Sequence, residues 1–305
     1  MNPPGSTRYG PSGWAFHACG KCWRTANRRE SAGTAKFLRT PGESWIPRSK
    51  RSSTRWRRLP GPRTGNENQI SFGQESDMKI LILSDIHANW PALQAVVQAE
   101  SDFDYLFFLG DLVDYGPDPE PCVDYIRRTA NVYVQGNHDH ALAFDVDCGC
   151  RQDFRDLSLS TRAWHQTLLP LIDIAFLQSM PVTMHTIVDG HHFWISHASP
   201  KGDLNAYLQP DEVVAAGHDI SADTILVGHT HIPFLRQVDG KVFLNPGSVG
   251  LPRDRGNHAA YAVVESGRPE LRSVAYDVQE TIRGLRESPL PEEVVQRLIE
   301  ILVKT

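Results

Sequence analysis

Five short segments of the chain place Asp, Asn or His residues directly after a run of apolar residues. They are Ser84-Asp85-Ile86-His87, Gly110-Asp111-Leu112-Val113-Asp114, Gly136-Asn137-His138-Asp139, Ser196-His197 and Gly228-His229-Thr230-His231. Carboxylate oxygen and imidazole nitrogen together suit ions such as Mn, Fe and Zn, whereas Ca²⁺ prefers oxygen ligands alone. These residues are too many for one tetrahedral ion, so they indicate a site for two cations, roughly 3.5 to 4 Å apart.

Two adjacent cations of this kind support one particular chemistry. They can lower the pKa of a bridging water and clamp phosphoryl oxygens while the resulting hydroxide attacks in line. A single Asp-x-His or His-x-His carries little weight, because it is most often surface sequence or a satisfied core histidine. The occurrence of five such segments in one chain favours the metal site.

The segments need elements that bring them together. Apolar runs of strand length end directly before them, at residues 79–83, 105–109, 132–134, 192–195 and 224–227. Helical sequence lies between the first runs, and this alternation predicts an α/β domain with buried, largely parallel strands. Ligands collect outside the carboxyl ends of such strands, so the segments from Asp85 to His231 are expected to converge in one crevice.

The remaining sequence completes the predicted architecture. Residues 89–99 and 119–128 have the pattern of amphipathic helices. From residue 232 onward short strands with turn residues replace that pattern. Asp239-Gly240 is typical of a hairpin, and further runs at 258–264 and 270–276 suggest an antiparallel second sheet. The fold class is therefore α/β, with two packed β-sheets flanked by helices.

Two helical regions are added to this core. Residues 151–180 form a helical insertion between two of the site segments, which suits a small cap over the site and equally a plain packing element. Residues 281–286 and 292–302 predict two closing helices that pack on the core.

The five segments, in this order, resemble the calcineurin-like metallophosphoesterase family, whose pattern is Asp-x-His, Gly-Asp, Gly-Asn-His-Asp, His and Gly-His-x-His. The stretch from Asn245 to Gly250 and the following Leu251-Pro252-Arg253-Asp254 are similar to the small bacterial phosphodiesterase and phosphatase branch. The resemblance covers residues 78 to about 277. It implies a four-layer sandwich with the helical insertion at about 151–180.

The resemblance also implies roles for individual residues. The first metal would be bound by Asp85, His87 and His231, and the second by Asn137, His197 and His229, with Asp111 bridging the two. His138 resembles the family's catalytic histidine, which protonates the leaving oxygen, and Asp114 resembles the carboxylate that orients it. Mn is the first choice of metal, with Fe, Zn or Ni as alternatives. The implied activity is hydrolysis of a small phosphomonoester, phosphodiester or nucleotide polyphosphate by metal-bound hydroxide.

Several nearby residues do not match a family ligand. Tyr115 stands where Ser/Thr protein phosphatases of this superfamily have an Arg, which argues against a phosphoprotein phosphatase of that type. Arg253 could supply the missing guanidinium to substrate, or form a surface ion pair with Asp254. Asp139 is expected to brace its loop by hydrogen bonding. The other histidines are expected to be ordinary: His140, His165, His185, His191, His192, His218 and His258.

Charge divides the chain into two parts. Residues 1–77 carry 14 basic and 5 acidic residues, a balance of +9, whereas the other 17 basic and 31 acidic residues give −14. The first part lacks a sustained apolar period, so we expect a disordered basic extension, and Met78 is the favoured true start. Residues 78–305 would form the metallophosphoesterase domain. An acidic domain disfavours nucleic acid as a partner and hence a nuclease, while a non-catalytic scaffold is disfavoured because no ligand residue is missing.

The cellular context follows from what the chain lacks. Without an apolar stretch long enough for a membrane span or signal sequence, we expect a cytoplasmic protein with no membrane partner and a small phosphate-ester substrate. Homo-oligomerisation stays open. The odd number of cysteines does not indicate a disulfide framework, and Cys19 and Cys22 alone are a weak zinc signal. Cys148 and Cys150, beside Asp145 and Asp147, could form a separate site, but reduced thiols in a loop are expected.

Overall fold

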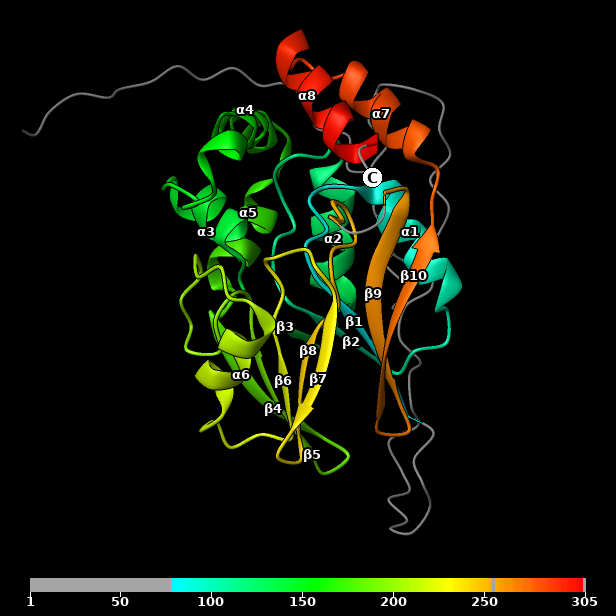
Figure 1. Ribbon diagram of the computed structural model, residues 1–305. Helices are drawn as coiled ribbons and strands as arrows, with labels where there is room; N and C mark the ends of the chain where they lie inside the picture. Colours follow the sequence, from blue (N-terminus) through cyan, green and yellow to red (C-terminus); the bar gives the residue numbers. More distant parts are fainter. Residues whose placement is uncertain (1–77, 254–255, 304–305) are drawn as a thin grey trace, which may run out of the picture. The chain divides into compact units, whose positions relative to one another are not determined.

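The computed structural model describes residues 78–253 and 256–303, and Figure 1 shows how their helices and strands are arranged. The predicted basic extension of residues 1–77 lies outside these ranges. Within them the chain forms two mixed sheets of five strands each. None of the helices in the described ranges is long and apolar enough to cross a membrane.

The first sheet holds the early strands of the chain. Its order is β10-β9-β1-β2-β3. The strands are β1 (Lys79–Leu83), β2 (Tyr105–Phe108), β3 (Val132–Tyr133), β9 (His258–Glu265) and β10 (Arg268–Ala275). The pairs β1–β2 and β2–β3 are parallel, and the hairpin of β9 and β10 runs antiparallel along the other edge of β1.

The second sheet is also mixed, with order β4-β5-β6-β8-β7. Its strands are β4 (Thr183–Val188), β5 (His191–Ser196), β6 (Thr224–Leu226), β7 (Phe234–Val238) and β8 (Lys241–Asn245). The three central strands β5, β6 and β8 are parallel, while β4 and β7 pair antiparallel at the edges.

The expectation of an antiparallel second sheet was wrong. The later strands do not form a sheet of their own: β7 and β8 join β5 and β6, whereas β9 and β10 extend the first sheet. Nearly every residue of β9 is buried, because Tyr261 and Val263 face the helices while Ala262 and Val264 face the second sheet. A strand buried on both faces needs a central place, and the free edge of β1 provides it.

Three apolar layers of contact hold the sandwich together. Between the sheets lie side chains such as Ile80, Ile82, Phe107, Phe193, Leu226 and Leu244. Helices α1 (Trp90–Ala99) and α2 (Pro119–Thr129) pack on the outer face of the first sheet. Helix α6 (Pro210–Gly217) covers the outer face of the second sheet through Val213. The predicted four-layer architecture is therefore confirmed.

The remaining helices lie near the carboxyl ends of the parallel strands (Figure 1). They are α3 (Asn137–Phe144), α4 (Gln152–Leu168), α5 (Leu171–Ser179), α7 (Val278–Arg286) and α8 (Glu292–Val303). The predicted helical insertion corresponds to α4 and α5. Helices α7 and α8 form one apolar cluster with Leu157 of α4 and with Tyr115 and Leu251 from site loops. The closing helices therefore pack against the loops that carry the site.

Candidate metal centre

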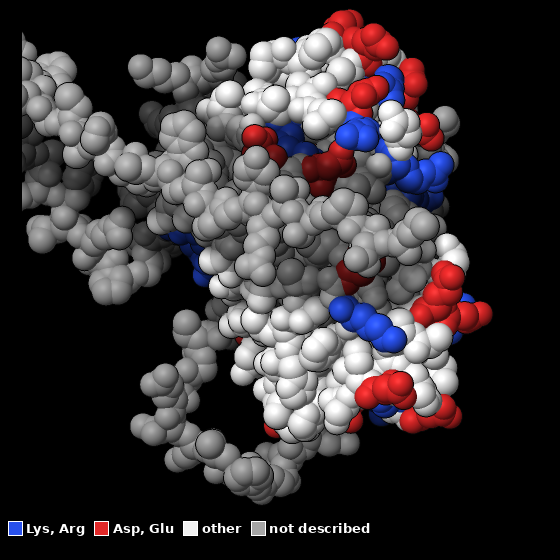
Figure 2. Space-filling model, turned by 90° about the vertical axis from the view of Figure 1, so that its left-hand side faces the viewer, with Lys and Arg blue, Asp and Glu red and all other residues white. Residues whose placement is uncertain are grey.

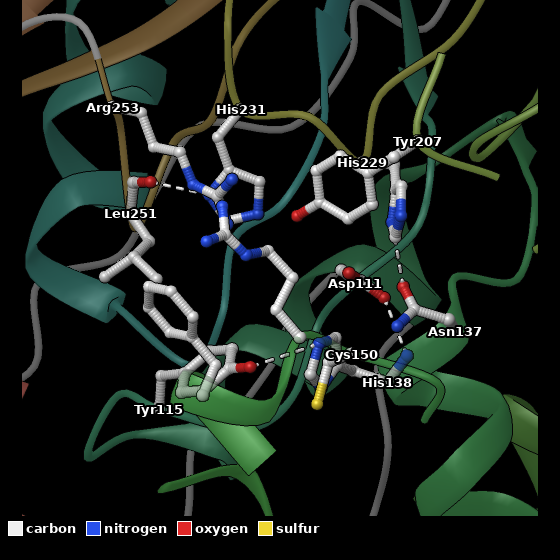
Figure 3. A pocket seen from close by; sticks show the side chains of 12 residues that line it. Asp111, Tyr115, Asn137, His138, Cys150, Tyr207, His229, His231, Leu251 and Arg253 are labelled. Carbon is white, nitrogen blue, oxygen red and sulfur yellow. Dashed lines mark hydrogen bonds between the residues drawn. The ribbon is translucent and has the colours of Figure 1, made fainter. Parts of the chain in front are cut away.

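The five segments named in the sequence converge at one edge of the two sheets. The loop after β1 is tied to the loop after β2 by the Asp85 N–H, which donates to the Gly110 carbonyl at 2.9 Å. The Gly228 N–H after β6 donates to the carbonyl of His197, which follows β5. Figure 3 shows side chains from these loops around a common pocket. Residues far apart in sequence thus share one site.

Asp85, His87 and His231 form a first group. All three are buried, and their donor atoms lie within 4.8 Å of one another. The Nε2 atoms of His87 and His231 are 3.2 Å apart, and Asp85 Oδ1 is 3.1 Å from His231 Nε2. This is the set that the resemblance implied for the first metal.

A second group contains Asp111, Asn137, His197 and His229. The donor atoms of Asp111, His197 and His229 lie within 4.8 Å of one another. Asn137 Oδ1 is 3.1 Å from both His197 Nε2 and His229 Nδ1. Asp111 Oδ2 lies between the two groups, at 3.2 Å from His197 Nε2 and 3.7 Å from His87 Nε2. One carboxylate oxygen therefore faces both sets of ligands, as a bridging residue must.

Backbone carbonyls fix the orientation of three of the histidines. The Nδ1–H groups of His87, His197 and His231 donate to the carbonyls of Val113, Leu109 and Leu251, at 2.9, 2.8 and 2.6 Å. Because Nδ1 donates to a carbonyl, Nε2 of each ring faces the site, where it can offer a lone pair to a metal ion when the ring is neutral. Such a second contact is typical of histidines that bind metal ions.

The ligand atoms of both groups are buried in an arrangement that is favourable when cations are bound between them. The lone pairs of His87 and His231 face each other, which is favourable only when a positive charge lies between them. Asp85 Oδ1, a ligand atom of the first group, is buried without a hydrogen bond. Burial alone would lower the pKa of His197, but the Asp111 carboxylate raises it to about 9. A divalent cation would replace that proton and satisfy these atoms.

The loops around the site adopt backbone conformations that most residues avoid. Asp85, His87, Asp111, His229 and His231 all have φ between 46° and 65°. A positive φ costs a residue other than glycine about 1 kcal/mol or more, so contacts with the surrounding structure must hold these residues in that conformation. Two glycines make room for this packing: a Cβ at Gly136 would lie 2.0 Å from Asp111 Oδ1, and one at Gly228 would lie 2.0 Å from Ser84 Oγ.

His138 and Asp114 form a buried pair beside the second group. Their Nδ1 and Oδ2 atoms are 2.7 Å apart, and the His138 N–H donates to Asp111 Oδ1 at 3.0 Å. Burial opposes a charged imidazole, but the carboxylates of Asp111 and Asp114 outweigh it and raise the pKa of His138. The pair has the geometry that the resemblance implied for a proton donor and its orienting carboxylate.

Helix α4 supplies residues that the sequence interpretation missed. The Ser158 hydroxyl and the Arg162 guanidinium donate to Asp114 Oδ2 at 2.7 and 2.9 Å. His165 Nδ1 accepts from the Asp114 N–H, and its Nε2–H donates to the Gly116 carbonyl at 2.9 Å. His165 was expected to be ordinary. The sequence did contain one indication: Ser158, Arg162 and His165 stand at positions i, i+4 and i+7, which share one face of a helix.

Asp139 braces its loop by hydrogen bonding, as expected. The carboxylate of Asp139 accepts from the backbone N–H groups of Asp111, Leu112 and Gly136, so it braces the loop. Burial and the nearby Asp111 charge raise the pKa of Asp139 to about 7. His140 contacts Gln135 and Phe144.

Tyr115, Phe154, Tyr207 and Arg253 line the pocket in front of the metal ligands. The Tyr115 hydroxyl lies 3.3 Å from His138 Nε2. The Arg253 guanidinium carbon lies 5.4 Å from the ring centre of Phe154 and 5.7 Å from that of Tyr207. Arg253 therefore faces the pocket (Figure 3). Its alternative partner, Asp254, lies outside the described ranges. Arg151, which the sequence interpretation did not name, lines the same pocket.

The expectation of reduced thiols in the 145–150 loop was wrong for this structure. Cys148 and Cys150 are joined by a disulfide. The two residues are separated only by Gly149, whose φ of +63° lets the chain turn back between them. Cys150 lines the pocket, which places the disulfide beside His138.

Comparison with known proteins identifies the family of this chain. Residues 78–267 match the sequence model of the calcineurin-like phosphoesterase superfamily domain. This chain belongs to the calcineurin-like phosphoesterase superfamily. The family is metal-dependent, and relatives named as a phosphodiesterase and a probable metallophosphoesterase suggest a phosphoester hydrolase. Helices α7 and α8 lie beyond the matched residues.

Three known proteins resemble most of the described chain. An uncharacterised protein of Methanocaldococcus jannaschii is 32% identical over 241 residues, covering 72% of this chain and 96% of that protein. The Escherichia coli phosphodiesterase YfcE is 26% identical over 193 residues, covering 62% and 88%. The crystal structure of a metallophosphoesterase from Sphaerobacter thermophilus matches with a TM-score of 0.63 and 31% identity, covering 73% and 98%. The predicted family is confirmed.

Proposed function

We propose that this protein hydrolyses small phosphate esters with two divalent cations held between Asp85, His87 and His231 on one side and Asn137, His197 and His229 on the other. The observation that carries the proposal is the position of Asp111 Oδ2, which faces both groups of ligand atoms. When bound, the ions would lower the pKa of a water and neutralise charge on the phosphoryl oxygens. Mn is the first candidate, and Fe, Zn or Ni suit the same donors.

The proposed role of His138 is to donate a proton to the leaving oxygen. The carboxylates of Asp111 and Asp114 raise the pKa of His138 and so favour the protonated ring, which is the form that a general acid requires. Asp114 accepts from Nδ1 and so directs Nε2 toward the pocket, where the Tyr115 hydroxyl lies at 3.3 Å. This help matters most when the leaving group is an alkoxide, because a phenolate leaves readily without it.

The walls of the pocket support a small anionic substrate. Arg151 and Arg253 line it together with the aromatic rings of Tyr115, Phe154 and Tyr207. Guanidinium groups suit phosphate oxygens, and the rings suit a planar organic group. We therefore propose a phosphodiester or a nucleotide polyphosphate as the first substrates to test, with phosphomonoesters as the alternative. The phosphodiesterase name of the Escherichia coli relative supports this order.

A single panel tests the proposal. The full chain is stripped of metal, reloaded separately with Mn, Fe, Zn or Ni, and assayed on aryl and alkyl monoesters, diesters and dinucleotide polyphosphates. We expect activity only after reloading, with two ions bound per chain. Full activity of metal-free protein, or metal binding without hydrolysis of any ester, would contradict the proposal.

A nuclease and a non-catalytic scaffold have less support. Residues 78–305 carry an excess of 14 acidic residues, and polyanion binding relies on clusters of Lys and Arg. On the face drawn in Figure 2, acidic and basic side chains of the described residues are interspersed. A scaffold would not need seven buried ligand residues. Tight, salt-sensitive binding of DNA by the folded domain would favour the nuclease.

A further inference from the structure

A second cluster of metal-binding atoms lies beside the proposed proton donor. One donor atom each from His138, Cys148 and Cys150 lies within 4.8 Å of the others. Cys148 is buried, Cys150 is half-buried, and Cys150 and His138 line the same pocket. Figure 3 shows Cys150 next to His138, on the opposite side of the pocket from Arg253. The proposed two-metal centre does not use either sulfur.

The chemistry of this cluster differs from that of the neighbouring centre. Two thiolates and one imidazole are the ligands of zinc-class cations, with metal–sulfur distances of about 2.3 Å and metal–nitrogen distances of about 2.0 Å. Three such ligands leave a fourth position open.

The disulfide decides whether the cluster can bind. A sulfur in the Cys148–Cys150 bond has no thiolate charge to offer a cation. A dithiol reductant would break this bond, form its own disulfide and leave two thiols, whose protons a bound cation then displaces. The loop itself is anchored independently, because the Cys148 carbonyl accepts a hydrogen bond from Asn137 Nδ2 at 2.8 Å.

We propose that the reduced Cys148 and Cys150, together with His138, bind one zinc-class cation that inhibits the enzyme, and that the disulfide prevents this binding. The ion withdraws His138 from proton donation, so the inhibitory part rests on the proposed function. The binding part does not. The disulfide form would be the active one in the presence of excess zinc.

The binding test uses Co²⁺, because thiolate ligands give it a charge-transfer absorption that oxygen and nitrogen ligands do not. The full chain carries Cys19→Ser and Cys22→Ser, which removes the other closely spaced pair. After reduction we expect one more ion per chain than in the oxidised protein, together with the thiolate band. Cys148→Ser/Cys150→Ser should lose both, whereas the matched control Cys122→Ser, at a buried cysteine of α2, should keep both. An unchanged band in the double variant would overturn the site.

The inhibition test adds excess Zn²⁺ to Mn-loaded protein. In the reduced form, activity on an alkyl ester should fall by about the 10²- to 10⁴-fold that a general acid contributes. The oxidised form and the reduced Cys148→Ser/Cys150→Ser variant should each show the same rate with excess Zn²⁺ as without it. Equal inhibition of all forms would refute the redox-dependent inhibition. If no form hydrolysed any ester, the proposed function would fail, while the Co²⁺ measurement would still decide whether the site exists.

Discussion

The two carboxylate oxygens of Asp111 have different partners. Oδ2 faces both groups of ligands, whereas Oδ1 accepts from the backbone N–H of His138. Asp111→Asn removes the charge that both cations need. We expect this variant to lose metal and activity together, as measured by metal analysis and turnover.

His138→Gln provides the contrasting prediction. Its side chain is not among the proposed ligands of the two-metal centre, so the metal content of the oxidised protein should stay unchanged. Turnover of alkyl esters should fall by roughly 10²- to 10⁴-fold, and turnover of aryl esters by much less, because only the poorer leaving group needs a proton. A full rate on an alkyl ester would show that His138 is not the proton donor.

Arg162 is expected to stabilise the ionised Asp114. Its side chain is 5% exposed and donates to Asp114 Oδ2 and Ser158 Oγ, at 2.9 and 2.7 Å. Arg162→Met leaves a buried carboxylate without this cation, so the free energy of unfolding should fall by about 3–5 kcal/mol. Ser158→Ala, which removes one neutral donor, should cost only about 1 kcal/mol. Urea unfolding measures both, and similar stabilities of the two variants would contradict this account.

The ligand residues could be predicted from sequence because their types and their places after apolar runs are both local features. Ser158, Arg162 and His165 were missed for a physical reason. Polar residues on a helix are usually solvated, and only the packed structure shows that this face of α4 covers Asp114. The Cys148–Cys150 disulfide was missed because spacing alone does not give a pairing or a redox state.

At the scale of elements, α4 fixes the loop after β2 through a neutral histidine. His165 accepts from the Asp114 N–H and donates to the Gly116 carbonyl, which requires an uncharged ring. Burial lowers the pKa of His165 to about 4 from its ordinary 6.5. As the pH falls, His165 is therefore protonated in the unfolded chain before it is protonated in the folded chain. The stability that the neutral ring contributes above pH 6.5 is lost as the pH falls toward 4.

This difference predicts a loss of roughly 3 kcal/mol between pH 7 and pH 4 from His165 alone. His165→Gln can still accept and donate at the same positions but does not titrate. Its stability should thus depend less steeply on pH than that of the wild type, as measured by urea unfolding across this range. Parallel pH curves for the two proteins would show that His165 has the same pKa in the folded and the unfolded chain.

The elements themselves were predicted more reliably than their pairing. The strand over residues 79–83 and the hairpin at Asp239-Gly240 follow from local apolar pattern and turn chemistry. The edge on which β9 and β10 pair depends on contacts between distant parts of the chain, such as Ile82 with Ala262. Such contacts leave no local pattern, which is why the second sheet was assigned incorrectly.

At the scale of the whole molecule, the charge of +9 on residues 1–77 contrasts with −14 on the rest. The family match begins at residue 78, one residue before β1, and the hydrogen bonds of the proposed centre come from residues 84–251. We therefore expect residues 78–305, expressed alone, to bind the same number of metal ions and to keep the turnover and unfolding midpoint of the full chain. The matched comparison is the full chain at low and high salt, because an electrostatic role of the basic extension would weaken as salt screens it. A truncated protein that lost metal, or a full chain whose activity alone responded to salt, would show that the extension contributes to the site.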